Sequence, residues 1–467
     1  MLYLTNTRTI NLFLERRKRC PIKCSKLTAL AWHLLSKYCA KLIEYIRDII
    51  YSEDFIYRNR FSSHDFTRNR KLPFHLLVLF LFNFVKGSYQ DELDKFFKAL
   101  RGFEVAKRIV SKVALAKARM KLKFEAFIEL NGRLTKYFYN NFNPILWKGF
   151  RLVAFDGSTV RLPHIKEISK HFGMWNVRKG DPCPMARVSQ MFDPLNRISL
   201  DAIISPKGMG ERKLAAKHCS NLRPLDLVLL DRGYPAFWFF KLILFYHADF
   251  CARISSTRWK VVRKFYFSGK KEKIIELPVT ASSVKACCEL GLDTNFIKLR
   301  LIRVELDSEV EILITSLIDT TLYPIDIFRE LYHDRWPVEE DYKTMKCWLE
   351  IENFSGKSIL SIYQDFHAKV FSKNLTSAIS FPTREPIRQA NANRKYDYQI
   401  NFTQALSKTK DVIVLLFQRA KGKISSLISD LHEIFIQTTE PIRPGRQFPR
   451  KHKGSRRKYF LNYKPIC

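Results

Sequence analysis

The spacing of apolar residues along the chain changes character near residue 149. Before that point apolar positions recur every three or four residues with few Gly or Pro, which predicts helices over residues 1–148. Examples are an apolar helix over 74–86 and a lysine-rich helix from Val110 to Leu122. Beyond it, runs rich in β-branched residues such as Arg151 to Leu162 predict strands. We therefore predict a helical N-terminal region followed by an α/β domain.

Residues 149–254 show strand and helix patterns in alternation. Two strand patterns, 186–192 and 198–205, flank the turn sequence Asp193-Pro194-Leu195-Asn196 and predict a hairpin. The remaining predicted elements are a helix over 211–219, a buried strand over 227–231, a helix over 236–247 and a strand over 250–254. A hairpin followed by alternating strands and helices predicts a mixed sheet, which forms the first part of the core.

The chain after residue 254 divides into three predicted parts. Residues 255–324 contain four strand-like runs (260–267, 274–279, 297–306 and 310–318) and predict a β-rich insertion. A long helix from Pro324 to Glu350 returns to the core, whose second part spans 325–381. Residues 382–467 combine an amphipathic helix, Val412 to Ile436, with a tail from Pro441 that has nine Lys and Arg and no acid. Such a tail is suited to binding a phosphate backbone.

The composition fits a cytoplasmic protein that works on nucleic acid. The chain has 81 Lys+Arg against 45 Asp+Glu, a net charge of +36, and a polyanionic partner accounts for such an excess. The 46% hydrophobic content excludes wholesale disorder, and the apolar run Leu76 to Val85 is too short to cross a membrane. Ten scattered Cys predict reduced thiols, and Cys20 and Cys24 lack a second ligand pair for zinc. We expect a cytoplasmic, nucleoid-associated protein without a membrane partner.

Two aspartates stand where ligand sites form in α/β sheets. Asp156 and Asp231 each follow an apolar strand and run directly into Gly157 or Arg232-Gly233. A carboxylate beside apolar neighbours must be paired or bind a cation. Either aspartate alone is also explained as a turn or helix N-cap residue. The presence of both in one domain favours a Mg²⁺ site with open positions for phosphate oxygens.

The predicted helix after residue 324 carries a polar stripe beside an apolar one. Tyr332, Arg335, Glu339 and Lys346 fall within an arc of roughly 60° on an ideal helix. The neighbouring apolar stripe, predicted to face the core, consists of Leu331, Val338, Tyr342, Met345 and Leu349. An ordinary solvated helix face is the alternative interpretation. An Arg, a Lys and a Tyr around one carboxylate instead favour a phosphate clamp beside a third metal ligand.

Taken together, these motifs resemble the DDE transposases of the IS4 insertion-sequence family. The resemblance is carried by Asp156-Gly157-Ser158, by Leu230-Asp231-Arg232-Gly233-Tyr234 and by Tyr332-x₂-Arg335-x₃-Glu339-x₆-Lys346, which matches the family's Y-R-E-K signature. It covers residues 60 to 450 or so, including Ala118 to Leu122 and Leu313 to Ile318. The resemblance implies an RNase H-like mixed-sheet core interrupted by the β-rich insertion.

The resemblance also implies roles for individual residues. Asp156, Asp231 and Glu339 would be the catalytic acids and would hold two Mg²⁺ ions, with Mn²⁺ as an alternative. Tyr332, Arg335 and Lys346 would contact DNA near the cleaved end. The implied reaction is cut-and-paste transposition, in which a phosphodiester is hydrolysed and the freed 3′-OH attacks target DNA. Its implied partners are double-stranded DNA with terminal inverted repeats, target DNA and a second copy of the chain, as a homodimer on DNA.

Other functions stay open at this point. A related RNase H-like nuclease would cut DNA without transferring strands, and a non-catalytic DNA-binding protein derived from a transposase would bind it only. A basic structural protein would explain the charge alone. One feature departs from the family, because some relatives stack a flipped base on a Trp where this chain has Val310-Glu311-Ile312. Base flipping is either absent or uses another aromatic residue such as Trp259.

Overall fold

The computed structural model describes residues 24–176, 181–306, 309–418, 424–443 and 459. Side chains at the N-terminal end are described from Ser36 onward. The basic tail predicted after Pro441 therefore lies outside the described residues, except for its first three positions and Tyr459. Cys20 also lies outside them.

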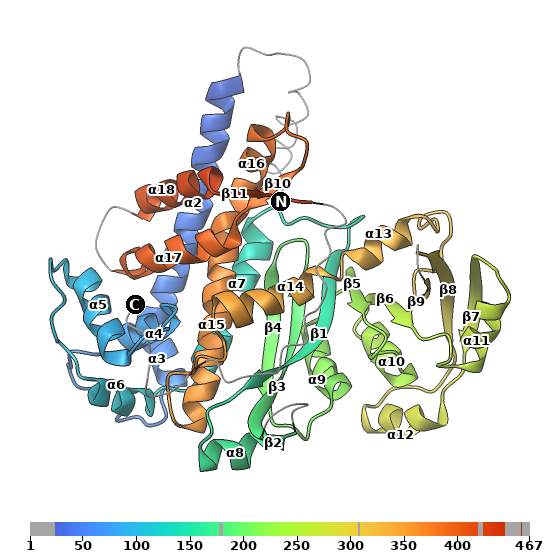
Figure 1. Ribbon diagram of the computed structural model, residues 1–467, viewed down its shortest axis with the longest axis horizontal. Helices are drawn as coiled ribbons and strands as arrows, with labels where there is room; N and C mark the ends of the chain where they lie inside the picture. Colours follow the sequence, from blue (N-terminus) through green and yellow to red (C-terminus); the bar gives the residue numbers. More distant parts are fainter. Residues whose placement is uncertain (1–23, 177–180, 307–308, 419–423, 444–458, 460–467) are drawn as a thin grey trace.

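A mixed sheet forms the centre of the molecule and contains nine strands within the described residues (Figure 1). These strands are β1 (Arg151–Arg161), β2 (Met174–Trp175), β3 (Cys183–Asp193), β4 (Ile198–Ser205), β5 (Asp226–Leu230), β6 (Asp249–Ile254), β7 (Glu272–Leu277), β8 (Ile297–Glu305) and β9 (Val310–Thr315). The order is β2-β3-β1-β5-β6-β9-β8-β7, with β4 paired to β3. A separate two-stranded sheet joins β10 (Tyr398–Ile400) to β11 (Thr439–Pro441).

The central strands have the topology expected of an RNase H-like core. Strand β1 pairs antiparallel with β3, which pairs antiparallel with β4, whereas β1, β5 and β6 are mutually parallel. An antiparallel hairpin therefore lies beside three parallel strands, in the order β4-β3-β1-β5-β6. This confirms the predicted fold class and the predicted hairpin around Asp193 to Asn196.

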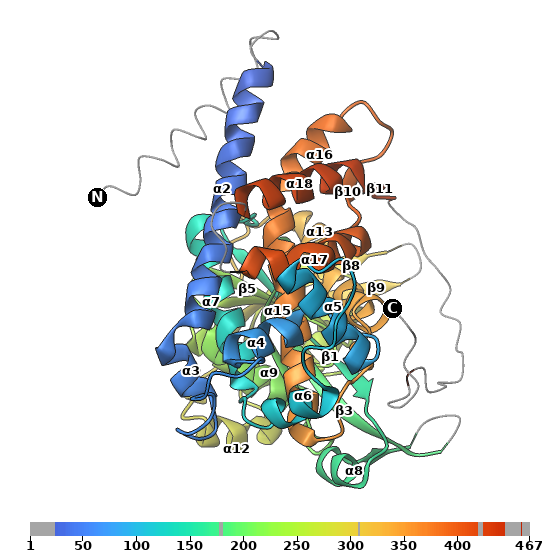
Figure 2. The ribbon, with the colours of Figure 1, turned by 90° about the vertical axis from the view of Figure 1, so that its left-hand side faces the viewer.

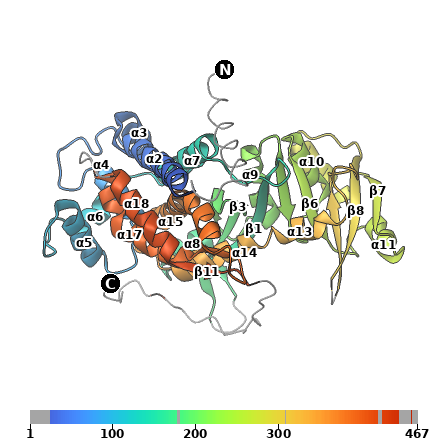
Figure 3. The same cartoon turned by 90° about the horizontal axis from the view of Figure 1, so that it is seen from above.

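Helices pack around this sheet and form most of the regular structure outside it (Figures 1 and 3). Those before β1 are α2 (Cys24–Tyr51), α3 (Glu53–Asn59), α4 (Phe74–Phe82), α5 (Tyr89–Arg101), α6 (Lys112–Arg119) and α7 (Glu125–Asn141). Those within the sheet region are α8 (Lys166–Phe172), α9 (Glu211–His218), α10 (Phe237–Phe245), α11 (Lys260–Phe267) and α12 (Ala281–Glu289). Those after β9 are α13 (Ile327–His333), α14 (Pro337–Lys343), α15 (Ile359–Ser380), α16 (Arg384–Ala390), α17 (Phe402–Phe417) and α18 (Ile424–Gln437).

The two faces of the sheet bury different helices. Because side chains alternate along a strand, Val153 and Phe155 of β1 face one side, where they pack with α9 and α10. Leu152 and Ala154 face the other side. That second side is covered by α13, α14 and α15, whose buried residues belong to the same apolar clusters. The helix α14 is therefore held against the sheet on the face opposite to α9.

The helices at the two ends of the chain share one apolar core. Helix α2 packs against α18, and α15 packs against α4, α7 and α17. Figure 2 shows α2 alongside α15 with α17 and α18 next to them. The prediction that residues 1–148 are mainly helical is confirmed for the described part. In the described residues, no helix is long and apolar enough to cross a membrane.

Several predicted elements differ from the structure. Residues 260–267 form helix α11 rather than a strand, because Val262 and Phe265 are three positions apart and both buried. A further helix, α12, also lies in the region predicted as β-rich, and β9 joins β7 and β8 to the central sheet through β6. The single helix predicted over 412–436 is two helices, α17 and α18. The domain boundaries themselves stay a prediction.

Candidate active site

Asp156 and Asp231 are brought side by side by the register of the parallel strands. Phe155 of β1 pairs with Leu230 of β5, so each aspartate is the next residue along its chain. Asp156 lies within β1 and not at its end as predicted, because β1 continues beside β3 to Arg161. Asp156 is nevertheless the first residue beyond the pairing with β5, where the two chains diverge. Both aspartates are half-buried.

The polar stripe predicted on one long helix is divided among four segments. Tyr332 lies in α13, Arg335 in a turn, Glu339 in α14, and Lys346 in a π-helical turn over Thr344–Trp348. The continuous helix was therefore a wrong prediction. Its physical cause is Pro337, which has no N–H to continue the hydrogen bonding and instead begins α14.

The apolar stripe beside these residues is confirmed. Its members are all buried: Leu331, Val338, Tyr342, Met345 and Leu349. Tyr332, Glu339 and Lys346 are half-buried, and Arg335 is buried. The break before Pro337 therefore leaves the apolar stripe buried, and the polar residues stay at the rim of the core.

Hydrogen bonds join the predicted motifs around Asp156. The Arg335 Nη2 donates to Glu339 Oε1 at 2.8 Å. The Lys346 ammonium donates to the Ser158 hydroxyl at 2.7 Å, and the Tyr342 hydroxyl donates to the backbone oxygen of Asp156 at 3.0 Å. The segment carrying Glu339 is thus attached directly to the strand carrying Asp156. The structure brings all six candidate residues into one region of the molecule.

The electrostatics of Asp156 reflect crowding by other acids. Burial raises its pKa to about 6, and the neighbouring carboxylates of Glu339 and Asp231 add to the increase. The Gly157 N–H and the Arg335 guanidinium oppose it. The three acids therefore lie close enough for their negative charges to interact.

Arg335 and Lys346 respond differently to the same environment. Burial alone would lower the pKa of the Arg335 guanidinium, but Tyr332 and Glu339 raise it overall. Burial lowers the pKa of the Lys346 ammonium, which Glu352 only partly offsets. Arg335 therefore keeps its positive charge beside the acids. In Lys346, by contrast, burial destabilises the protonated form of the side chain.

Three buried donor groups near these acids have no hydrogen-bond partner among the described residues. They are the hydroxyls of Tyr234 and Tyr332 and the Nε of Arg335. A Cβ on Gly157 would lie 3.6 Å from the Tyr234 hydroxyl and 3.2 Å from Glu211 Cγ, so glycine permits this close approach. Buried polar groups are normally satisfied, so such donors indicate a ligand that brings acceptor oxygens. Phosphate oxygens are acceptors of this kind.

The carboxylates fit a divalent cation by their chemistry, but they are not arranged as a finished metal site. Mg²⁺ prefers carboxylate oxygens, and a cation would relieve the charge crowding at Asp156. Within the described residues, however, no group of three His, Cys, Asp or Glu is positioned to hold a metal ion. Glu339 is instead paired with Arg335. The cysteines with described side chains are free thiols: Cys39, Cys183, Cys219, Cys251, Cys287, Cys288 and Cys347.

A buried ion pair behind the acids was missed by the sequence analysis. The Lys373 ammonium of α15 lies 2.7 Å from both carboxylate oxygens of Asp341, which is two residues after Glu339. Gln190 donates to Asp341 at 2.8 Å and is itself opposite Asp156 in the strand register. The available signal was that Asp341 borders the apolar stripe, on the side away from Glu339. We infer that this pair fixes α14 against the sheet.

Trp259 and Glu311, from the two segments considered for base flipping, each contact another side chain of the protein. Trp259 is half-buried and meets Phe240 edge-on, with ring centroids 6.1 Å apart. Glu311, in the Val310-Glu311-Ile312 segment that opens β9, is paired with Arg253 at 2.8 Å. Base flipping in this chain stays a prediction.

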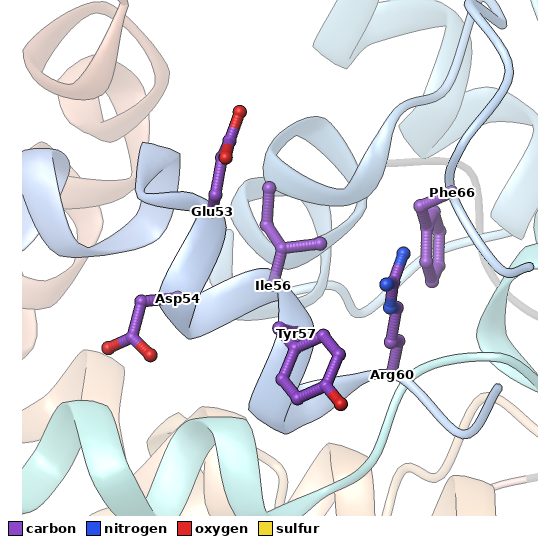
Figure 4. Close-up of a pocket in the computed structure, with 6 residues that line it drawn as sticks. All are labelled: Glu53, Asp54, Ile56, Tyr57, Arg60 and Phe66. Carbon is purple, nitrogen blue, oxygen red and sulfur yellow. The ribbon is translucent and has the colours of Figure 1, made fainter. Parts of the chain in front are cut away.

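A separate pocket of about 590 Å³ lies in the N-terminal helical region. Figure 4 shows the side chains that line it, with the guanidinium of Arg60 centred 5.4 Å from the Tyr57 ring. Its lining residues are Glu53, Asp54, Ile56, Tyr57, Arg60 and Phe66. None of the six candidate residues lines this pocket, which is therefore distinct from the candidate site.

The family model and one relative describe the same class of protein. A family model for the transposase DDE domain matches residues 147–375, which include all six candidate residues. The chain is 22% identical over 403 residues to the transposase InsG for insertion sequence element IS4 of Escherichia coli (strain K12), covering 84% of this chain and 88% of that protein. It is also similar to a cryo-EM structure of the piggyBac transposase synaptic complex with hairpin DNA, with TM-score 0.43, 8% identity, and coverage of 90% and 88% of the two chains.

Proposed function

Since the chain belongs to the DDE transposases of the IS4 insertion-sequence family, we propose that it cuts insertion-sequence ends and joins them to target DNA, using Asp156, Asp231 and Glu339. The observation that carries this assignment is the register that sets Asp156 beside Asp231, with the Arg335–Glu339 pair acting on the same carboxylate. Three acids and a guanidinium lie together where the central parallel strands β1 and β5 of the RNase H-like sheet diverge. In this function the protein acts in the cytoplasm, on DNA of the nucleoid.

DDE transposases generally use divalent metal ions, and we propose Mg²⁺, with Mn²⁺ as an alternative. Asp156, Asp231 and Glu339 would hold two ions, which supply an activated water and later an activated 3′-OH. The structure pairs Glu339 with Arg335, so the carboxylate would have to be shared or released when a cation is bound. The raised pKa of Asp156 means that it keeps a proton more readily than an ordinary aspartate.

Tyr332, Arg335 and Lys346 are proposed to hold the DNA strand at these acids. The unpartnered Tyr332 hydroxyl and Arg335 Nε are donors that phosphate oxygens would satisfy. Arg335 suits this role because its guanidinium keeps its charge when buried. Lys346, bonded to Ser158, extends the positive surface along the strand that carries Asp156.

The direct test is cleavage of DNA carrying the terminal sequences that flank the gene. The purified chain with Mg²⁺ should nick or cut at the repeat ends and then produce joined target DNA, and ends should pair through two copies of the chain. Cutting without joining would favour a nuclease. Specific binding without any cutting would favour a DNA-binding protein derived from a transposase.

The raised pKa of Asp156 predicts a pH-dependent effect of Asp156→Asn on stability. An aspartate whose pKa is raised on folding contributes stability that is present below its unfolded pKa and is lost as pH rises through the folded value. Between about pH 4 and about pH 6 the wild type should therefore lose stability relative to the asparagine variant. The difference should approach, at most, about 3 kcal/mol above that range. Thermal unfolding of both proteins across this range measures it.

The same experiment has a metal arm. At neutral pH, Mg²⁺ should raise the unfolding temperature of the wild type and should leave Asp156→Asn almost unchanged, because the ion binds only the folded site. A stability difference that does not vary with pH would show that Asp156 titrates normally. Equal stabilisation of both proteins by Mg²⁺ would place the ion elsewhere.

Arg335→Ala is expected to slow cleavage by roughly 10- to 150-fold, since a charge-assisted hydrogen bond contributes about 1.5–3 kcal/mol. The loss should appear in single-turnover cleavage and not in gel-shift affinity if the contact forms mainly in the cleavage-ready complex. Arg335→Lys should recover only part of the rate, because an ammonium lacks the planar fork. Arg329→Ala, at an exposed position of α13, is the matched control. Equal losses in binding and cleavage would make Arg335 a general DNA-binding residue.

A further inference from the structure

Two arginines from different elements are fixed on the turn that follows Asp231. Arg212 of α9 donates its Nε to the Gly233 backbone oxygen at 2.8 Å. Arg258, in the loop after β6, donates its Nη2 to the Pro235 backbone oxygen at 3.2 Å. The turn that begins at Asp231 therefore positions both guanidinium groups.

These bonds orient the two side chains without neutralising them. A backbone carbonyl is neutral, and each bond uses one of the five donors of a guanidinium. Burial lowers the pKa of Arg212, and the positive charge of Arg258 lowers it further, which places the two cations near each other. Arg232, in the same turn, is exposed. Among the ion pairs of the described residues, none involves Arg212, Arg232 or Arg258.

The acid that precedes Arg212 in the chain is already engaged. Glu211 precedes Arg212, and its carboxylate accepts from Arg187 at 2.7 Å. Holding like charges together without an acid between them is unfavourable unless an anion is shared. The cluster therefore has the charge and the donors of an anion-binding site, built on the segment that carries a proposed catalytic acid.

The cluster lies on the face of the sheet opposite to that of Arg335. Helix α9 packs on the sheet face of Val153 and Phe155, whereas α13 and α14 pack on the other face. Arg258 follows β6, the strand beyond β5 in the sheet. The two groups of cations thus lie on opposite faces of the sheet, and by strand alternation Asp156 is on the face of Arg335.

We propose that Arg212 and Arg258 form a second phosphate-binding site, which holds the DNA backbone on the far side of the scissile phosphate from Arg335. This inference rests on the proposed function and adds a partner contact to the same site. Guanidinium groups match phosphate oxygens in both charge and geometry. A strand held by Arg335 on one face and by this pair on the other would have its reacting phosphate fixed between them.

The test is the salt dependence of DNA binding by the double variant Arg212→Gln/Arg258→Gln. The probe is a labelled duplex carrying the terminal repeat that flanks the gene. The slope of log affinity against log salt should fall by about 0.9 for each phosphate that the variant no longer neutralises, and affinity at low salt should fall by roughly 10-fold. Glutamine keeps a donor for each backbone carbonyl. Unchanged unfolding temperature shows that the turn is intact.

A matched control removes two other positive charges. Arg133→Gln/Arg388→Gln changes the net charge equally, and these arginines are paired with Glu129 and Glu385 on their own helices. This control should retain the wild-type slope. If its slope falls as much as that of the test variant, net charge alone explains the effect and the proposed site is wrong.

Neutral methylphosphonate substitutions, scanned along the duplex, locate the bound phosphates. The affinity of the wild type should fall at one or two positions beyond the cleavage site where the affinity of the double variant falls no further. A double variant whose affinity falls like that of the wild type at every position overturns the second site. Wild-type cleavage of the same duplex tests the proposed function separately. A wild type that cuts, with a variant of unchanged slope, removes only the second site, and a wild type that neither binds nor cuts removes both.

Discussion

Replacing Asp156 or Asp231 by Asn, or Glu339 by Gln, is expected to reduce DNA cleavage to background while end binding stays close to wild type. Each substitution keeps the size of the side chain and removes a negative charge that a divalent cation requires. Metal ions contribute several kcal/mol to the transition state, and a loss of about 4 kcal/mol slows a step by roughly 10³-fold. Single-turnover cleavage in Mg²⁺, beside a gel shift at the same salt, measures both quantities.

The chain offers a matched control for the glutamate. Glu340 is adjacent to Glu339 on α14 but is exposed and paired with Lys343. Glu340→Gln removes the same charge from the same helix and should cleave at nearly the wild-type rate. Mg²⁺-dependent cleavage retained by any of the three variants would remove that residue from the proposed site. A parallel loss in Glu340→Gln would show that charge on α14, and not metal binding, is what matters.

The location of the acids could be predicted because its signals are local. A strand pattern followed by an acid, with a glycine one or two positions later, identifies Asp156 and Asp231 without knowledge of their surroundings. Their adjacency then follows from parallel pairing, which the structure provides between Phe155 and Leu230. The Tyr332-to-Lys346 stripe was predicted from its spacing on one helix. The structure has two helices and a π-helical turn there, but the four residues still lie in one region.

The errors arose where one local signal opposed another. Pro337 breaks the hydrogen bonding of a segment whose apolar periodicity is otherwise continuous, and the backbone followed the proline. Adjacent β-branched residues at Val261 and Val262 favoured a strand over 260–267, but the burial of Val262 and Phe265 needs helical spacing. In both cases the periodicity located the buried positions correctly and only the backbone path was misjudged.

Contacts between distant segments could not be predicted from these patterns. Arg212 and Arg258 are held by backbone carbonyls, and a carbonyl is present at every residue, so it leaves no trace in the sequence. The Lys373–Asp341 pair joins helices 32 positions apart, and Lys373 lies in a segment whose other residues are largely buried. A charge in such a segment signals that a partner exists, but the partner emerges only from the packing of α15 against the sheet.

Lys373→Met is expected to be the most destabilising single change near the candidate site. Lys373 is fully buried and lies 2.7 Å from both oxygens of Asp341, which also accepts from Gln190. Methionine has a similar length but leaves the Asp341 charge buried without its counterion. Removing one partner of a buried pair typically costs about 3–5 kcal/mol. The unfolding temperature of the full-length protein should fall accordingly.

A second substitution separates the charge effect from the loss of packing. In Lys373→Met/Asp341→Asn no charge is left buried, and the asparagine can still accept from Gln190, so much of the stability should return. Lys369→Met provides a comparison on the same helix, because that ammonium donates to a neutral acceptor, the Glu350 backbone oxygen, at 2.7 Å. It should cost less than Lys373→Met.

The pair should also affect catalysis through the position of Glu339. Asp341 is two residues beyond Glu339 on α14, and Gln190 links it to the strand opposite Asp156. The double variant, once its stability is restored, should still cleave more slowly than wild type, because a neutral contact holds α14 less firmly against the sheet. Raising the Mg²⁺ concentration should recover part of the rate if the loss lies in how Glu339 meets the ion. A double variant that is stable and cleaves at the wild-type rate would show that the ion pair supports the fold alone, and a Lys373→Met protein as stable as wild type would refute the stability argument itself.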